Sequence, residues 1–396
     1  MKRVLLADPV CAQLLGHNLS LLINFRKYIL SLNLYDKVEL VSSTELPENL
    51  STEFDVERLF HFYYHNRMNI SGSRKFNSFK KDADHRNYEE ECIDFAIEDF
   101  RNLISRLDVK NDDSIFYPGV DFYGAFGALQ ELQRHTVELA PSLYLRFMGV
   151  MEYSSRLFPD PRRELLRQIR ACISKGYRIR LSAESSLYAD HLATALEEPV
   201  AATPVPPFQS CHDLDGGDEF VVICPGSGRI DKGFNILPEI VKMFRINHED
   251  KNVRFVIQNL PPWELENNIK YVTQLYATPG VEVLPASINF HEMSQLYKRS
   301  HIVLMPYDPN TYAMRSSAIL TESVAYGRQV VTSRGTGFEG EVAYFNLGKL
   351  CSSVVEYADA IAQYSSMARS HLTSTSNQVR QRYVKYCSSQ YREFLQ

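Results

Sequence analysis

The feature that most limits the fold of this chain is a regular alternation of short β-rich runs with longer stretches of helical periodicity. Residues 3–7 have the composition of a buried strand, and residues 18–32 place apolar side chains at helical spacing. The alternation continues with strands expected at 38–41, 114–117, 143–147 and 178–181, and helices at 88–107, 122–133, 162–173 and 183–196. Repeated strand–helix units predict a parallel sheet that helices cover on both faces.

A proline-rich segment interrupts this alternation near the middle of the chain. Residues 199–218, PVAATPVPPFQSCHDLDGGD, contain four prolines and two glycines without a helical period, which is typical of a linker. The pattern then resumes, with strands expected at 220–224, 253–258, 281–284, 302–305 and 329–332 and helices at 234–247, 263–276, 290–298 and 316–326. Two successive α/β halves are therefore expected.

The length of the chain agrees with this division, because 396 residues exceed the size of most single cores. We expect one domain over residues 1–205, a second over residues 215–375, and a C-terminal helix over residues 376–396 that packs back on the first domain. Residues 61–86 are aromatic and basic and do not fit the alternation, so they are expected to form a long loop.

Charge and cysteine usage exclude several classes of protein. A net charge of −5 argues against a protein that binds nucleic acid over its whole surface. The seven cysteines are scattered and include no CxxC pair, so they indicate free thiols in a reducing compartment and no zinc or redox motif. The apolar run at the N-terminus is too short for a signal peptide, and no run reaches the roughly 18 residues of a membrane span. We expect a cytoplasmic protein.

The segment 304–332, LMPYDPNTYAMRSSAILTESVAYGRQVVT, combines a strand, a loop, a helix, a glycine turn and a second strand. Its loop follows the carboxyl end of a parallel strand, where open α/β sheets bind ligands. Ser316 or Ser317 can cap the helix, and the N–H groups at the helix start suit a diphosphate. Glu322 in the second turn can bind a ribose diol. The alternative is that Glu322 is a solvated helix residue paired with Arg315.

A second motif, PGSGRIDKGF at residues 225–234, directly follows a strand and leads into a helix. Gly226 and Gly228, on either side of Ser227, permit a tight turn with close backbone approach to a ligand. Arg229 and Lys232 add two cations, which would stabilise negative charge on a departing nucleoside diphosphate. The alternative is a surface turn with solvated cations.

Together these two motifs make the second half of the chain resemble the nucleotide-sugar domain of glycosyltransferase family 4, the retaining class with two Rossmann-like domains (GT-B). The resemblance implies that these domains face each other across a central cleft, with the acceptor on the first and the nucleotide sugar on the second. It implies that Arg229 and Lys232 contact the donor diphosphate and that Glu322 binds the donor ribose.

The sequence departs from the family pattern at one position. The first glutamate of the family's Glu-x7-Glu motif, which touches the donor sugar, would fall at Met314. We expect Arg315, Ser316 and Ser317 to take over the sugar and phosphate contacts. The expected donor site consists of Gly16, Gly226, Ser227, Gly228, Arg229, Lys232, Arg315, Ser316, Ser317 and Glu322.

The acceptor side of the site is expected in the first domain. Gly16 and His17 partly match the Gly-Gly-His-like turn that the family places between its first strand and first helix, facing the acceptor and the donor phosphate. His17 is thus a candidate to orient the acceptor or phosphate, or alternatively a residue that caps the helix. Asp121 is a candidate acceptor base, with a helix cap as the alternative.

A basic cluster spans residues 156–180 and contains eight cations: Arg156, Arg162, Arg163, Arg167, Arg170, Lys175, Arg178 and Arg180. Such a run attracts anionic lipid headgroups or a pyrophosphate-linked lipid. The alternative is a solvated face. The cluster therefore leaves open a peripheral contact with the inner face of the membrane.

The sequence predicts a glycosyltransferase that moves a sugar from a nucleoside-diphosphate sugar to a glycan or lipid-linked acceptor with retention of anomeric configuration. The sugar nucleotide is a co-substrate, and neither a cofactor nor a metal is expected, because Asp231 and Asp308 do not form a DxD motif. The alternatives are a nucleotide-sugar 2-epimerase and a non-catalytic scaffold that binds a sugar nucleotide.

Overall fold

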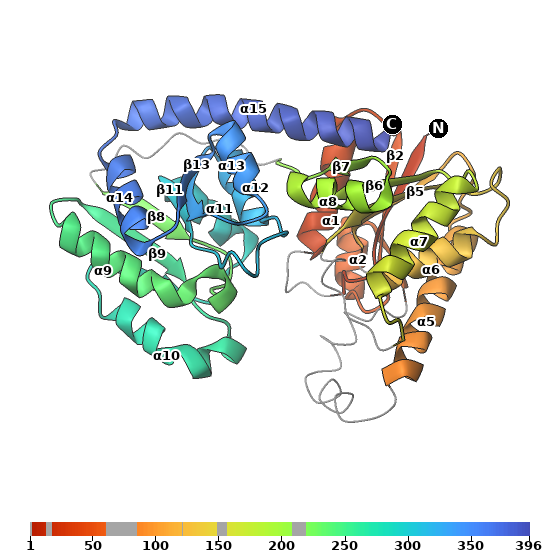
Figure 1. The fold of residues 1–396 in the computed structure, drawn as a ribbon, viewed down its shortest axis with the longest axis horizontal. Helices are drawn as coiled ribbons and strands as arrows, with labels where there is room; N and C mark the ends of the chain where they lie inside the picture. Colours follow the sequence, from red (N-terminus) through yellow and green to blue (C-terminus); the bar gives the residue numbers. More distant parts are fainter. Residues whose placement is uncertain (1, 13–17, 61–84, 121, 149–156, 208–218) are drawn as a thin grey trace. The chain divides into compact units, whose positions relative to one another are not determined.

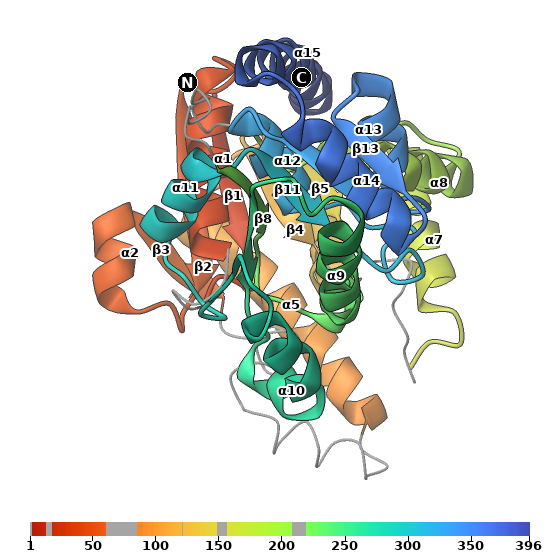
Figure 2. The same ribbon diagram turned by 90° about the vertical axis from the view of Figure 1, so that its left-hand side faces the viewer.

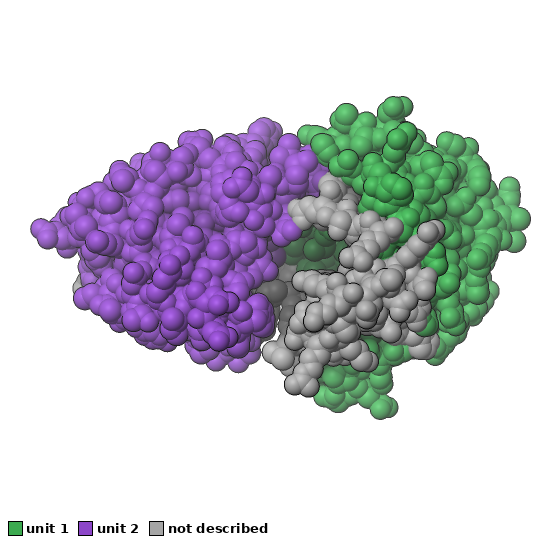
Figure 3. All heavy atoms as spheres, turned by 60° about the horizontal axis from the view of Figure 1, so that its bottom comes forward, with its two compact units in different colours: residues 1–184, 189–206, 390–396 green, residues 185–188, 207–389 purple. Residues whose placement is uncertain are grey.

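The computed structural model describes residues 2–12, 18–60, 85–120, 122–148, 157–207 and 219–396. The chain divides into two compact units (Figures 1 and 3). Unit 1 contains residues Met1–Glu184, Ala189–Pro206 and Gln390–Gln396, and unit 2 contains Ser185–Tyr188 and Pro207–Ser389. Each unit has its own parallel sheet, so the predicted class of two α/β domains is confirmed.

Unit 1 is built on a seven-stranded sheet in the order β3-β2-β1-β4-β5-β6-β7. The strands are β1 (Arg3–Asp8), β2 (Lys37–Ser43), β3 (Val56–Phe60), β4 (Ser114–Val120), β5 (Ser142–Phe147), β6 (Ile179–Ala183) and β7 (Val200–Ala202). The helices are α1 (Asn18–Ser31), α2 (Glu48–Phe54), α5 (His85–Arg106), α6 (Phe122–Leu132), α7 (Pro161–Ser174) and α8 (Ser186–Leu196).

Two parts of unit 1 differ from the sequence-based expectation. The segment 199–218 is not a linker throughout, because β7 lies within it and pairs in parallel with β6 from Val200 to Ala202. Its prolines flank the strand and leave the paired residues free to form the ladder. The pair formed by α2 and β3 was not expected, because both are short and mix polar with apolar residues.

Unit 2 is built on a six-stranded sheet in the order β10-β9-β8-β11-β12-β13. The strands are β8 (Phe220–Cys224), β9 (Val253–Gln258), β10 (Val281–Leu284), β11 (Ile302–Met305), β12 (Gln329–Ser333) and β13 (Gly348–Cys351). Two 3-10 turns, η2 (Ile230–Lys232) and η3 (Phe234–Ile236), precede the helices α9 (Leu237–Asn247), α10 (Pro262–Tyr276), α11 (Phe290–Arg299), α12 (Ala318–Ala325), α13 (Glu339–Phe345), α14 (Val354–Ser365) and α15 (Arg369–Leu395).

The two faces of this sheet bury separate apolar cores. Phe255 and Ile257 of β9 pack with α9, α10 and α14, whereas Val256 between them packs with α11, α12 and α13. Figure 2 shows α9 and α14 on one side of these strands and α11 on the other. Because helices cover both faces of the sheet, the side chains on both faces of each strand are buried. The strand sequences are therefore continuous apolar runs.

The last helix, α15, begins at Arg369, earlier than expected. Val379, Tyr383 and Cys387 pack in the core of unit 2, and one helical turn later Tyr391 and Leu395 pack in the core of unit 1. Among the helices in the described part of the chain, none combines the length and apolar character needed to cross a membrane.

Candidate functional site

The order of strands in unit 2 reverses between β8 and β11, which are neighbours in the sheet although β9 and β10 separate them in the sequence. In open α/β sheets, ligands bind beyond the carboxyl ends of the strands at such a switch point. The loop that follows β8 carries the glycine-rich motif, and the loop that follows β11 leads to Glu322. The topology therefore brings together the two segments that the sequence singled out.

Two glycines of the glycine-rich turn have a positive φ. Gly226 has a φ of +84° and donates its N–H to the side-chain oxygen of Gln258 on β9, at 2.6 Å. Gly233 has a φ of +79°, and a Cβ atom there would lie 1.8 Å from the carbonyl oxygen of Pro306. The turn therefore packs directly against the loop after β11. Ser227 and Gly228 lie within this turn, with Ser227 partly exposed.

The ammonium group of Lys232 folds back over this turn. Its Nζ donates to the carbonyl oxygen of Gly226 at 2.9 Å. Burial and the neighbouring charge of Arg229 lower the pKa of Lys232 to about 8, while the charges of Asp231, Cys224 and Glu322 oppose that shift. Lys232 is therefore a partly desolvated cation rather than a freely solvated one.

Arg229 is held by partners on both sides. Its guanidinium makes a bidentate pair with Asp231, at 2.9 and 2.7 Å, and Nη2 also donates to the hydroxyl of Tyr312 at 3.0 Å. Tyr312 belongs to the loop after β11, so Arg229 connects the two loops of the site. The Asp231 carboxylate was visible in the motif, but the tyrosine gave no signal in the sequence.

Glu322 lies in the second turn of α12, and Ser317 caps this helix by accepting from the N–H of Leu320 at 3.4 Å. The hydroxyl of Tyr297 donates to Oε2 of Glu322 at 3.2 Å. Burial raises the pKa of Glu322 to about 7, against the Tyr297 hydrogen bond and the charge of Lys232, which lower it. Glu322 is thus a half-buried carboxylate with a fixed partner, Tyr297, which the sequence did not reveal.

The residues between Tyr312 and α12 belong to the same loop, which follows β11. The Arg315 guanidinium lies 6.0 Å from the centre of the Tyr312 ring, and Ser316 is partly exposed. The backbone carbonyl of Met314 accepts from the hydroxyl of Ser185 at 3.4 Å. At the position where the family pattern has a glutamate, the chain thus has a thioether side chain on a tethered backbone.

The remaining predicted site residues, Gly16, His17 and Asp121, lie outside the described residues. In unit 1 the strand order also reverses, between β1 and β4, and these residues follow those two strands in the sequence. Their roles stay predictions.

Several cations of the basic cluster make hydrogen bonds or ion pairs within unit 1. Arg167 pairs with Glu164 in bidentate fashion, and Arg170 donates to the carbonyl of Leu196 at 3.0 Å. Arg178 donates to the carbonyl oxygen of Ala140 at 2.6 Å. These cations stabilise the fold locally. Arg162 and Arg163 at the start of α7 are exposed, as are Arg167, Arg170, Lys175, Arg178 and Arg180, and Arg156 lies outside the described residues.

The side chains that could bind a metal in the described part of the chain are those of His, Cys, Asp and Glu. Within the described ranges, no group of three His, Cys, Asp or Glu side chains is placed to hold a metal ion. The charges that gather at the switch point of unit 2 are instead Arg229, Lys232, Asp231 and Glu322.

Comparison with solved structures identifies the fold. The sequence matches no protein-family model and no curated protein. The structure is similar to a trehalose-6-phosphate synthase from E. coli bound with UDP-2-fluoro glucose, with a TM-score of 0.63, 11% identity, and coverage of 100% of this chain and 99% of that chain.

Two further structures give the same result. A trehalose-6-phosphate synthase studied for enzymatic glycosyltransfer with retention has a TM-score of 0.61 at 11% identity, with 99% of this chain and 98% of that chain covered. A lipopolysaccharide outer core galactosyltransferase has a TM-score of 0.58 at 11% identity, with 100% and 99% covered. The GT-B fold predicted from the sequence is therefore confirmed.

Proposed function

We propose that this protein is a glycosyltransferase that moves a sugar from a nucleoside-diphosphate sugar to a glycan or lipid-linked acceptor with retention of anomeric configuration. The observation that carries the proposal is the meeting of Lys232 and Glu322 at the switch point of unit 2. Each interacts electrostatically with the other, although they come from different loops. The shared fold with sugar-transferring enzymes supports the same conclusion.

In this proposal the donor diphosphate lies against the glycine-rich turn. Gly226, Ser227 and Gly228 let the backbone approach the phosphates closely, and Lys232 and Arg229 supply positive charge. As the bond from the sugar to the phosphate breaks, negative charge grows on the bridging oxygen. Cations that are already held in place stabilise that charge without reorganisation. No resident cofactor takes part.

Glu322 binds the donor ribose. Tyr297 holds Oε2, so Oε1 is available to accept hydrogen bonds from the ribose hydroxyls. Arg315, Ser316 and Ser317 contact the sugar or phosphate in place of the glutamate that Met314 replaces.

On the acceptor side, His17 orients the acceptor or phosphate and Asp121 acts as its base. Retention is supported by the likeness to an enzyme studied for glycosyltransfer with retention. We infer that the protein acts in the cytoplasm and, when the acceptor is lipid-linked, at the membrane surface through the exposed arginines of α7.

The first test is a thermal-shift panel with UDP, GDP, ADP, CMP and their sugar conjugates. A ligand present at 100 times its dissociation constant stabilises the folded protein by about 2.7 kcal/mol. A selective rise with one nucleotide diphosphate identifies the donor class. Turnover with and without acceptor then separates transfer from epimerisation and from a scaffold that does neither.

Lys232→Ala and Glu322→Ala are each expected to lower kcat/KM for the donor by about 100-fold. Lys242→Ala and Glu239→Ala are matched controls, because both side chains are exposed on α9 away from the turn. Near wild-type turnover by both site variants would show that the assigned site is wrong.

A further inference from the structure

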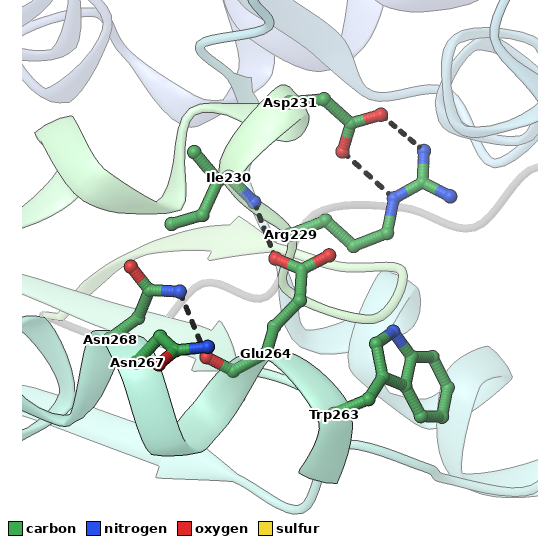
Figure 4. Close-up of a pocket in the computed structure, with 7 residues that line it drawn as sticks. All are labelled: Arg229, Ile230, Asp231, Trp263, Glu264, Asn267 and Asn268. Carbon is green, nitrogen blue, oxygen red and sulfur yellow. Dashed lines mark hydrogen bonds and ion pairs between the residues drawn. The ribbon is translucent and has the colours of Figure 1, made fainter. Parts of the chain in front are cut away.

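A second surface feature of unit 2 lies beside the glycine-rich turn (Figure 4). It is an open groove of about 450 Å³ between the η2 turn and the first turns of α10. Its lining residues are Arg229, Ile230, Asp231, Trp263, Glu264, Asn267 and Asn268. The function proposed above uses only Arg229 of these and leaves the α10 side of the groove without a role.

The most unusual residue of the groove is Trp263. It is the only tryptophan of the chain, and 75% of its surface is exposed. Tryptophan is usually well buried, because its large apolar rings gain free energy by leaving water. Figure 4 shows the indole standing on the first turn of α10, pointing away from the bond between Glu264 and Ile230. An exposed indole over a groove provides a flat apolar platform.

Polar side chains with fixed positions surround this platform. Oε2 of Glu264 accepts from the N–H of Ile230 at 2.9 Å, which orients the carboxylate and leaves Oε1 as an acceptor. The side chain of Asn268 donates to the carbonyl of Glu264 at 2.8 Å, where α10 is kinked. Asn267 is exposed beside it and offers both donors and acceptors.

On the α10 side of the groove the lining charge disfavours an anion. Arg229 and Asp231 lie on the side of the η2 turn, where they pair with each other, and Glu264 is the charged residue that α10 contributes. A phosphate on the α10 side would therefore meet negative charge. Carboxylates and amides are instead good partners for hydroxyl groups. A hydroxyl donates a hydrogen bond to a carboxylate, and it can both donate to and accept from an amide.

We propose that this groove binds a neutral saccharide unit. One face of the pyranose ring, with its slightly positive C–H groups, stacks on the electron-rich face of Trp263. Its hydroxyls bind Glu264 and Asn267. The inference rests on the proposed function in one respect, which is that the saccharide belongs to the glycan acceptor or product.

The single tryptophan makes the test direct. Emission of Trp263 is followed while the full-length protein is titrated, without donor, with neutral oligomers of glucose, galactose, mannose and N-acetylglucosamine. A saturable shift with protection from acrylamide quenching is expected for at least one of them. A response to UDP alone, or no response to any oligomer at millimolar concentration, would overturn the proposal.

Substitutions then locate the bound sugar. Asn267→Ala keeps the fluorophore and is expected to weaken saccharide binding by about five- to tenfold. Trp263→Ala, followed by calorimetry, is expected to lose at least about tenfold in affinity, with partial recovery in Trp263→Tyr. Tyr276→Ala is the control, since Tyr276 is a similarly exposed aromatic residue, 64%, at the other end of α10.

These outcomes separate the groove from the donor site. Saccharide binding without any effect of nucleotide sugars would remove the proposed transferase function but leave the groove assignment intact. If the Asn267→Ala and Trp263→Ala variants transfer sugar at the wild-type rate, the groove does not bind the acceptor saccharide, and the proposed transferase function is unaffected.

Discussion

Lys232 and Glu322 are two half-buried charges whose pKa values are shifted toward each other. Burial lowers the pKa of the lysine to about 8 and raises that of the glutamate to about 7. Each side chain has one fixed hydrogen-bond partner, the Gly226 carbonyl and the Tyr297 hydroxyl respectively. Charges kept in such a costly environment are typical of binding and catalytic sites.

This pair predicts a bell-shaped pH dependence of kcat/KM for the donor. Glu322 binds ribose as a carboxylate, so activity rises as pH passes about 7, and Lys232 binds phosphate when protonated, so activity falls above about 8. Glu322→Gln is expected to remove the acidic limb. Lys232→Arg is expected to move the alkaline limb to higher pH, because a guanidinium stays charged there.

The thermal stability of the Glu322→Gln variant shows whether the Glu322 carboxylate stabilises the fold. A carboxyl whose pKa is raised on folding binds its proton more tightly in the folded state, so stability falls as pH rises from 4.5 toward about 7. Glu322→Gln removes this loss and is expected to raise Tm above pH 7 while donor binding weakens. A flat activity profile in the wild type, or a less stable Glu322→Gln variant, would contradict this account.

At the scale of elements, the turn between β8 and α9 determines where Lys232 lies. Gly233 has a positive φ and touches the backbone of Pro306, so it sets the distance between the two loops of the site. The residue after Lys232 therefore controls the site through the backbone rather than through a side chain.

Gly233→Ala is expected to destabilise the protein by about 2–3 kcal/mol, because both the positive φ and the clash must be accommodated. Donor affinity should fall as well, since the turn moves away from Pro306. Gly340→Ala in α13 is the matched control, since a Cβ there meets nothing within 4 Å. That control should be neutral or stabilising by about 0.4–1 kcal/mol. Equal stability of the two variants by denaturant titration would be the contrary result.

At the scale of the whole molecule, α15 contributes to the cores of both units. Phe394 is 2% exposed and packs edge-on against Phe116 and Tyr144 in unit 1, with ring centres 5.4 and 5.3 Å apart. The hydroxyl of Tyr391 donates to the carbonyl of Pro204 at 2.6 Å. The last turn of the chain therefore completes the core of the first unit.

Phe394→Ala is expected to destabilise unit 1 by about 3–5 kcal/mol, because it removes a buried ring. Scanning calorimetry should show a lower first transition, and nucleotide binding to unit 2 should persist below that temperature. Glu393→Ala, an exposed neighbour on the same helix, is expected to leave the transition unchanged. A single transition that shifts as one for both units would instead mean that they unfold together.

The periodic pattern of the sequence determined the class of the fold, because a buried parallel strand must be apolar throughout and a covering helix must repeat every three to four residues. It also located the glycine-rich turn and the loop before α12, where glycine and capping serine leave local signals. Short elements were missed, including α2, β3, β7, α13 and β13, because a few residues carry too little periodicity to distinguish them from loops. The twelve-residue helix α14 was missed as well.

The tertiary structure alone decided which segments meet. The adjacency of β8 and β11, the partners Tyr297 and Tyr312, and the groove beside Trp263 all depend on contacts between residues far apart in the chain. The local sequence determines which side chains of a segment are buried and whether the segment forms a helix or a strand. It does not determine which distant segment pairs with it in a sheet, because that pairing depends on the packing of the whole domain.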